Sequence, residues 1–324
     1  MAITLSRMWS YTVGGRPHVT RGQPVQRLTI SRTLSGYDHD PNGVRWCGAA
    51  YVQAYQPAGA SRPPLVLLPG GGLSGSIWES TPDGRDGWLT DFLHHGWPVH
   101  IVDPPERGRA GWNPYAAPYQ TRPVSRTAEE IWTNFRIGRL GAHRGWADRV
   151  PFSGTRFPVQ DIDAMLRLSG PRWPDSTEIA VAAAVALVDQ LGPCVLIGHS
   201  HGGFAAEVAA ARPTLVRACV LIEPHGTLAP PPAGTGPQLL VRGDFLDEDH
   251  LDQVPVYRNL VAAWADYRAA ATRAGVRVDV LDLVGSGITG NTHMVMCDDN
   301  SHQVAALLSE WLDRCIGPRA DDAA

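Results

Sequence analysis

The chain has 324 residues, of which 44% are hydrophobic, and its formal net charge is −4. That length allows one large α/β domain with an insertion or two smaller domains, and the apolar content suffices for a buried core. The weak negative charge argues against nucleic-acid binding and against a basic membrane-binding surface. The chain contains no lysine, which excludes Schiff-base chemistry, pyridoxal-phosphate enzymes and a Walker phosphate loop.

No apolar stretch is long enough to cross a bilayer, and residues 1–20 lack the apolar core of a signal peptide. We therefore expect a cytoplasmic protein without a membrane partner. The five cysteines are scattered, and a disulfide between Cys297 and Cys315 is the one pairing to consider. No zinc-ligand spacing occurs, so we expect no metal and no cofactor. The run Asp38-His39-Asp40 precedes Pro-Asn-Gly and reads as a surface turn.

Short apolar runs alternate with helix-like stretches along the chain. We predict strands at 48–55, 65–68, 99–102, 195–197, 219–222, 238–242 and 276–283. We predict helices at 87–95, 177–191, 202–211, 256–274 and 301–315. This alternation is typical of a mostly parallel, doubly wound α/β sheet that helices cover on both faces.

The stretch 104–174 interrupts the alternation and is too long for an ordinary connection. We predict that it is a cap or lid inserted into a core domain made of residues 1–103 and 175–324. Its aromatic side chains would then line a pocket above Ser200, and the alternative for each of them is packing inside the cap's own small core. The candidate substrate-binding residues are Trp78, Trp112, Trp132 and Phe135.

Residues 196–203 read Leu-Ile-Gly-His-Ser-His-Gly-Gly. An apolar strand leads into the turn, an alanine-rich helical stretch follows, and Ser200 stands at the tip. This is the context of a nucleophile elbow, in which glycines flank the serine because a side chain there would clash. The pattern predicts Ser200 as the nucleophile.

A serine hydroxyl needs a base within hydrogen-bond reach, and the base needs an orienting carboxylate. In a doubly wound hydrolase sheet these partners follow in the order serine, acid, histidine. The histidine belongs to the loop between the last strand and the last helix, here 285–300. His293 lies in the middle of that loop, so we predict it as the base.

The position of the acid stays open on these grounds. Glu223 directly follows the predicted strand 219–222, whereas Asp247 follows the next strand, with Asp244 as a nearer variant. A carboxylate at a strand end is held rigidly, as orienting a base requires. The alternative explanation for the aspartates is capping of the following helix. The alternative for Glu223 is a buried charge paired with an arginine, which is costly and therefore uncommon.

An oxyanion hole needs two backbone N–H groups that point at the developing charge. One is expected from His201, the residue after the nucleophile. The other is expected from the glycine run after strand 65–68, where Gly71 is the first choice and Gly72 the second. Glycines there let the backbone approach a substrate closely.

Residues from about 45 to about 315 resemble the α/β-hydrolase superfamily. Three stretches are similar, more narrowly, to the bacterial esterase 713-like group: PGGGLSG at 69–75, WESTPDGR at 78–85 and GNTHM at 290–294. In that group the acid is a glutamate after the strand that follows the nucleophile helix, so the resemblance implies Glu223 as the acid and His293 as the histidine. Pro69 departs from the histidine that many hydrolases carry there.

Together these features predict a serine carboxylic-ester hydrolase with the triad Ser200, His293 and Glu223 and an acyl-enzyme intermediate. Its substrate would be a small-molecule ester, and a homodimer is compatible with the sequence. An amidase, lactonase, thioesterase or carbon–carbon hydrolase with the same triad is the alternative. A non-catalytic ligand-binding protein on a hydrolase fold is a further one.

Overall fold

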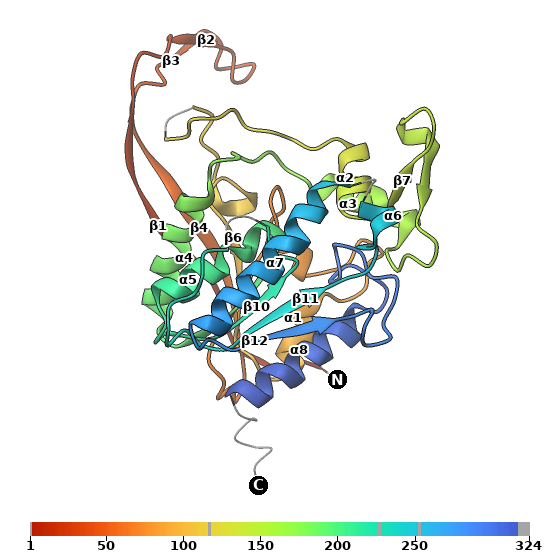
Figure 1. Cartoon of the computed structure of the whole chain (residues 1–324). Coiled ribbons are helices and arrows are strands. Elements are labelled where there is room, and N and C mark those ends of the chain that lie inside the picture. Colours follow the sequence, from red (N-terminus) through yellow and green to blue (C-terminus); the bar gives the residue numbers. More distant parts are fainter. Residues whose placement is uncertain (1, 116–117, 226–227, 252–253, 317–324) are drawn as a thin grey trace.

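The computed structural model describes residues 2–115, 118–225, 228–251 and 254–316. A central sheet runs through the molecule (Figure 1). It has eight strands in the order β1-β4-β6-β5-β9-β10-β11-β12. Its strands are β1 Leu5–Thr20, β4 Gly43–Pro57, β5 Leu65–Leu68, β6 Val99–Asp103, β9 Cys194–His199, β10 Val216–Ile222, β11 Gln238–Arg242 and β12 Val278–Asp282. Strand β4 pairs antiparallel with β1 and with β6, and the remaining pairs are parallel. The predicted mostly parallel α/β sheet is confirmed.

Helices cover both faces of this sheet. The described α-helices, on the sheet and elsewhere, are α1 Trp88–His94, α2 Ala128–Asn134, α3 Ile162–Leu168, α4 Thr177–Leu191, α5 Ala205–Ala211, α6 Glu248–Leu251, α7 Val256–Arg273 and α8 Ser301–Ile316. One apolar cluster includes residues of α1 and α8, and a second includes residues of α4, α5 and α7. Along β5, Leu65 and Leu67 belong to the first cluster, while Val66 and Leu68 belong to the second. Successive side chains of a strand point to opposite faces of the sheet, so β5 contributes to the apolar cluster on each face.

Strand β1 is the strand of the central sheet that the sequence prediction missed. Most of its side chains are exposed, and Val13 is one of its few buried positions. The strand lies at the edge of the sheet and carries no apolar run of the kind that marks β5 or β9. Gly14 adopts a φ of 70°, and a Cβ atom there would lie 2.9 Å from the Cα atom of Ala183. The edge strand therefore approaches α4 closely at a glycine, and Val13 is its buried side chain in the same apolar cluster.

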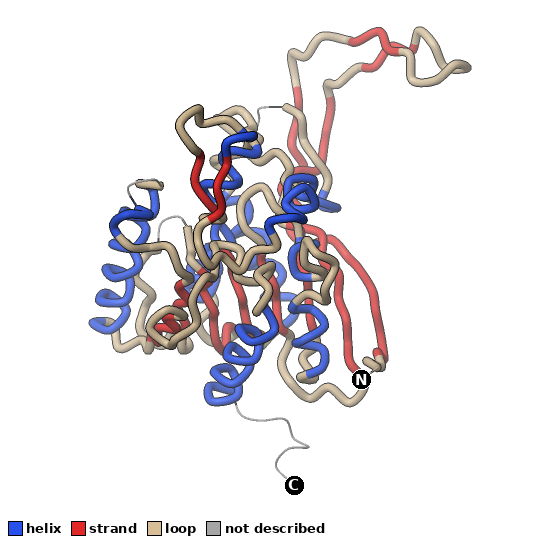
Figure 2. The backbone as a smooth tube through the Cα atoms, turned by 90° about the vertical axis from the view of Figure 1, so that its right-hand side faces the viewer, coloured by secondary structure: helices blue, strands red, loops and turns tan. Residues whose placement is uncertain are grey.

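Strands β1 and β4 continue into a projecting arm, defined here as residues 21–42, which stands away from the body (Figures 1 and 2). Its short strands β2 Gln26–Leu28 and β3 Tyr37–His39 pair antiparallel. The turn around Asp40 lies here, where its carboxylate accepts the backbone N–H of Asn42 at 2.9 Å. Within the described ranges no group of histidines, cysteines and carboxylates could hold a metal ion.

The segment 104–174 lies between β6 and α4 and contains α2, α3 and a two-stranded sheet of β7 Gly138–Leu140 and β8 Arg149–Pro151. Its side chains reach the loops at the carboxyl ends of the central strands. Arg107 donates to the carbonyl of Gly70, after β5, and Arg136 donates to the carboxylate of Glu223, after β10. The sheet's carboxyl edge is where open α/β folds bind ligands.

The cysteines are free, so the disulfide considered between Cys297 and Cys315 is wrong. Cys297 is 1% exposed and packs in the apolar cluster between the sheet and α8, where a small hydrophobic side chain suffices. Cys315 lies on α8 itself and is partly buried. None of the described helices is both long enough and apolar enough to span a membrane.

Candidate active site

Ser200 directly follows β9 and has a φ of 55°. This left-handed conformation is uncommon for a residue with a side chain and stores local strain. The flanking glycines are required by space: a Cβ atom on Gly198 would lie 2.0 Å from the carbonyl oxygen of Gly202, and one on Gly202 would lie 2.3 Å from that of Leu68. The backbone therefore has the geometry of a nucleophile elbow.

His293 and Glu223 form a buried hydrogen bond. Nδ1 of His293 lies 2.6 Å from Oε2 of Glu223, and their side chains are 1% and 0% exposed. A carboxylate accepts hydrogen bonds, so Nδ1 carries the proton and Nε2 offers its lone pair. Burial lowers the pKa of His293 below its ordinary 6.5, and the hydrogen bond with Glu223 opposes that shift. The imidazole is thus held neutral in the tautomer that a general base needs.

The carboxylate of Glu223 is fixed from two further directions. Arg136 donates Nη1 to Oε2 at 2.7 Å and Nη2 to Oε1 at 2.5 Å, and Gly243 donates its N–H to Oε1 at 2.8 Å. Although burial acts against ionisation, the Arg136 charge and the His293 hydrogen bond hold the pKa of Glu223 far below its ordinary value. The carboxylate therefore stays ionised beneath the imidazole.

Arg136 was missed by the sequence analysis. Its guanidinium lies 4.4 Å from the ring centroid of Tyr257, and its Nε donates to the carbonyl of Asp244 at 3.0 Å. The residue follows α2 with a φ of 53° and is 1% exposed. An arginine after a short helix in an irregular segment carries no sequence signal for burial, since arginines are mostly exposed.

Both aspartates that competed with Glu223 are engaged elsewhere. Asp247 is exposed, and its carboxylate accepts the N–H of His250 at 3.1 Å and pairs with the Nδ1 atom at 2.6 Å. Asp244 accepts the N–H of Gly290 at 2.6 Å. Among the described carboxylates, Glu223 is the one hydrogen bonded to the His293 ring, so the geometry favours it as the orienting acid.

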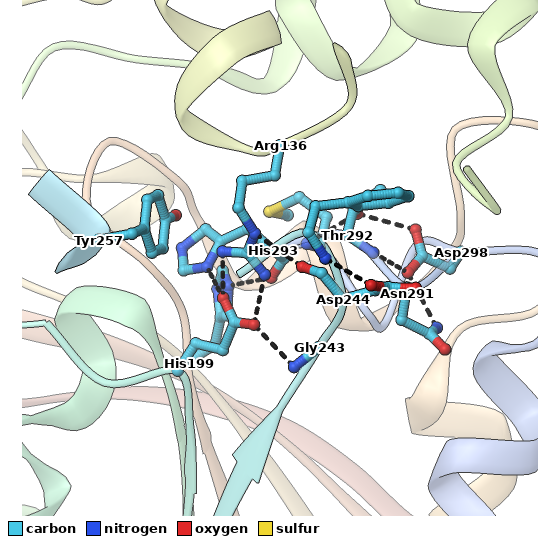
Figure 3. Close-up of polar contacts among 12 residues, drawn as sticks. Arg136, His199, Gly243, Asp244, Tyr257, Asn291, Thr292, His293 and Asp298 are labelled. Atoms are coloured by element: carbon cyan, nitrogen blue, oxygen red, sulfur yellow. Dashed lines mark hydrogen bonds and ion pairs between the residues drawn. The ribbon is translucent and has the colours of Figure 1, made fainter. Parts of the chain in front are cut away.

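The loop that carries His293 is cross-linked to its surroundings (Figure 3). The N–H of His293 donates to the carbonyl of Phe135 at 3.0 Å, and its carbonyl is 2.9 Å from Nε2 of His199. Asp298 accepts the N–H and the hydroxyl of Thr292, both at 2.8 Å, and the side-chain amide of Asn291 at 3.0 Å. The imidazole therefore sits on a fixed backbone.

No hydrogen bond joins Oγ of Ser200 to Nε2 of His293 within the described structure, but His199 and His225 link the two residues. The N–H of His225 donates to the carbonyl of Ser200 at 2.8 Å, and the rings of His225 and His293 lie 5.1 Å apart. The ring of His199, which precedes the serine, is 4.6 Å from that of His293. Catalytic hydrogen bonds are often long before a substrate binds.

Two arginines orient the glycine loop that follows β5. Arg107 donates to the carbonyl of Gly70 at 2.6 Å, and Arg126 donates to the carbonyl of Gly71 at 2.6 Å. In a trans peptide the C=O and the next N–H point in opposite directions. These bonds therefore set the direction of the N–H groups of Gly71 and Gly72. A Cβ atom on Gly71 would lie 3.3 Å from Cβ of His201, so the two expected oxyanion donors are adjacent.

The aromatic residues predicted for substrate binding have different positions. Phe135 lies at the site, with its ring centroid 5.8 Å from that of His293. Trp78 and Trp132 are both 0% exposed and offer no surface to a substrate in this structure. Trp112 is 41% exposed and stacks on another tryptophan. Trp78 and Trp132 belong to the first apolar cluster, which includes residues of the sheet, α1 and α8 and is not a separate small core of the cap.

The comparison with known proteins agrees with this architecture. A model of the alpha/beta hydrolase fold family matches residues 63–274, and the chain belongs to that family. A solved structure described as a novel bacterial esterase is similar over 98% of both chains, with a TM-score of 0.81 and 29% identity. The probable secreted lipase phiG of Fungal sp. (strain ATCC 74256) is 27% identical, in an alignment that covers 82% of this chain and 85% of that protein. The α/β-hydrolase fold expected from the resemblance is confirmed.

Proposed function

We propose that this protein hydrolyses carboxylic esters, with Ser200 as the nucleophile, His293 as the base and Glu223 as the orienting acid. The observation that carries the proposal is the buried 2.6 Å contact between His293 and Glu223 beside the strained turn of Ser200. The bacterial esterase and the probable fungal lipase support an ester as the substrate class.

In the acylation step, Oγ of Ser200 attacks the acyl carbonyl carbon while Nε2 of His293 takes the hydroxyl proton. Glu223 keeps the Nδ1 proton in place and stabilises the imidazolium that forms. The N–H groups of Gly71 and His201 donate to the tetrahedral oxyanion, with Gly72 as the alternative donor. The ester C–O bond then breaks, and the imidazolium protonates the departing alcohol.

In the deacylation step, a water molecule takes the place of the alcohol. His293 removes a proton from this water, which attacks the carbonyl carbon of the acyl-serine. Collapse of the second tetrahedral intermediate releases the carboxylic acid and returns the proton to Ser200. Every proton passes through the same imidazole.

The segment 104–174 is the cap of this site in our proposal. It supplies Phe135 beside His293 and the arginines that hold Glu223 and the glycine loop. A cap of this kind sets specificity because it borders the space above the nucleophile. The cellular compartment stays a prediction: the sequence led us to expect the cytoplasm, whereas the fungal relative is named as secreted.

The experiment is labelling with a fluorophosphonate probe together with hydrolysis of 4-nitrophenyl butyrate. The unmodified protein should be labelled at Ser200 and should turn the ester over. Ser200→Ala should abolish labelling and lower kcat on the order of a millionfold, to the background rate. Folded Ser200→Ala protein with ordinary turnover would refute the assignment, and an unlabelled, inactive parent protein would indicate a non-catalytic binding protein instead. Amide, lactone and thioester substrates in the same assay separate the other hydrolase classes.

A further inference from the structure

Three arginines of the segment 104–174 converge on the glycine loop beside Ser200. Arg172 Nη1 lies 3.3 Å from the position of a Cβ atom on Gly71, and Arg126 Nη1 lies 3.3 Å from that of a Cβ atom on Gly72. Nη2 of Arg107 is 3.4 Å from Nδ1 of His201. All three cations thus border the residues that we assign to the oxyanion hole. We name them the arginine cluster.

The arginine cluster lacks a counter-charge in contact with it. Within the described part of the chain, none of its three guanidinium groups forms an ion pair with a carboxylate. Burial and the charge of Arg172 lower the pKa of Arg107 to about 9, with Asp103 acting in the opposite direction. Burial and the charge of Arg126 lower the pKa of Arg172. Carboxylates that form no ion pair with the cluster act against the pKa shifts of Arg107 (Asp103) and Arg126 (Glu130), whereas no anion of the described residues acts on Arg172.

His201, which lies next to the arginine cluster, carries no charge of its own. Burial and the three arginines lower its pKa to about 3, which keeps the ring neutral. Its Nε2 is already 3.0 Å from the hydroxyl of Thr177. The imidazole is a fixed neutral neighbour of the cluster.

The three arginines differ in what they are free to do. Arg107 and Arg126 are bound to carbonyls of the glycine loop. By contrast, the guanidinium of Arg172 has no hydrogen bond to any described residue and is partly exposed. The backbone of Arg172 is fixed, because its N–H and C=O both pair with Val124. A partly buried guanidinium on a fixed backbone, without a partner among the described residues, is suited to bind an external anion.

We propose that the preferred ester substrate carries a carboxylate group, which the guanidinium of Arg172 binds with the charge of Arg126 beside it. This inference rests on the proposed function, because it places the anion next to the scissile bond. The carboxylate is a spectator: water still cleaves the ester C–O bond and yields an acid and an alcohol. A carboxylate on the acyl part and one on the alcohol part offer the same chemistry to Arg172.

The test compares charged esters with neutral ones of similar shape. Monoethyl glutarate against ethyl pentanoate places the charge on the acyl side, and 4-butanoyloxybenzoate against 4-butanoyloxybenzamide places it on the alcohol side. For one of the two pairs, kcat/KM of the parent protein should favour the charged ester by about tenfold to a hundredfold, the range of a charge-assisted hydrogen bond. Added NaCl should reduce that preference.

The variant Arg172→Gln should collapse the charged-to-neutral ratio to near one, whereas Arg172→Lys should retain part of it. Arg122→Gln is the matched control, because Arg122 is exposed in the same segment and its loss changes the net charge equally. That control should keep the full ratio. Fluorophosphonate labelling of each variant checks that the site is folded.

A parent protein that hydrolyses neutral esters at Ser200 without preferring either charged ester would overturn this inference and leave the proposed function standing. The same holds if Arg172→Gln lowers kcat/KM of charged and neutral esters by an equal factor. If the parent protein is not labelled at Ser200 and hydrolyses none of the esters, the proposed function is refuted, and this inference with it.

Discussion

The guanidinium of Arg136 and the carboxylate of Glu223 form an ion pair almost completely withdrawn from water, with exposed fractions of 1% and 0%. Such a pair contributes little net stability, because desolvation of both charges offsets their attraction. Its role here is geometric. The bidentate contact fixes the plane of the carboxylate that His293 meets.

The first prediction concerns removal of one partner of this pair. Arg136→Met leaves Glu223 as an uncompensated buried charge, which should lower the free energy of unfolding by about 3–5 kcal/mol. Urea denaturation followed by tryptophan fluorescence measures it. Arg212→Met is the control, since Arg212 pairs with Asp189 at the surface, where both are partly exposed and such pairs contribute little. An equal, small effect of both substitutions would contradict the role given to Arg136.

The second prediction concerns the pH dependence of catalysis. The base must be unprotonated, and burial lowers the pKa of His293 below 6.5, so the acidic limb of kcat/KM should have its midpoint below pH 6.5. The hydrogen bond to Glu223 raises that pKa. Glu223→Gln should therefore move the limb to still lower pH while kcat falls about 10⁴-fold. A limb that moves upward in Glu223→Gln would show that the carboxylate does not act on this imidazole.

Residues of the site differ in how far the sequence predicts them. Ser200 and His293 follow from local rules, a strand–turn–helix string and a loop position. Glu223 needed a family resemblance, because a strand end is compatible with more than one acid. Arg107 and Arg136 were not predicted, since each acts through a contact with a residue far along the chain. Long-range partners of buried charges have no local pattern.

At the scale of elements, the sheet strands that are buried on both faces were predicted with the correct bounds or nearly so. Strands β5 and β11 match residue for residue, as does helix α4. Strand β1 was missed because an edge strand needs no apolar run, and its exposed residues resemble a loop. Periodicity reports burial, so an element that is little buried leaves little periodicity.

The third prediction belongs to the loop between β12 and α8. Asp298→Ala removes the acceptor of three hydrogen bonds that hold Asn291 and Thr292. The backbone under His293 should loosen, and kcat should fall about tenfold to a hundredfold with little change in KM, because a misplaced base acts on the transition state. Steady-state kinetics measures the split between kcat and KM.

A matched control for this loop is Asp299→Ala. Asp299 is the next residue, and its exposed side chain pairs with Arg156, with 59% and 36% of the two side chains accessible. Exposed pairs contribute little, so this variant should keep kcat within about twofold. If both variants lose kcat equally, the effect comes from general disturbance of the loop and not from the bonds of Asp298.

At the scale of the whole molecule, the catalytic framework and the projecting arm are separate in packing. No residue of the arm, 21–42, belongs to either apolar cluster, and its short strands pair with each other. Several of its large apolar side chains are open to solvent: Val25 58%, Ile30 59%, Leu34 46% and Tyr37 43%. The arm therefore contributes no core packing within one chain.

The fourth prediction follows from this separation. Thr20 and Gly43 are paired across β1 and β4, so Asn-Gly in place of residues 21–42 should close them with a two-residue hairpin turn. The shortened protein should unfold in one cooperative transition with its free energy of unfolding within about 1 kcal/mol of the parent, because the deleted residues bury no shared core. Its kcat/KM on 4-nitrophenyl butyrate should stay within about twofold.

Gly14→Val, within the paired part of β1 and β4, is the contrasting variant. Its Cβ atom would lie 2.9 Å from the Cα atom of Ala183 at a φ of 70°, so a clear loss of stability is expected there. Light scattering of the parent and of the shortened protein shows whether the exposed side chains of the arm join two copies. If the shortened protein changes from dimer to monomer and loses activity with that change, the arm is not separate from the catalytic framework.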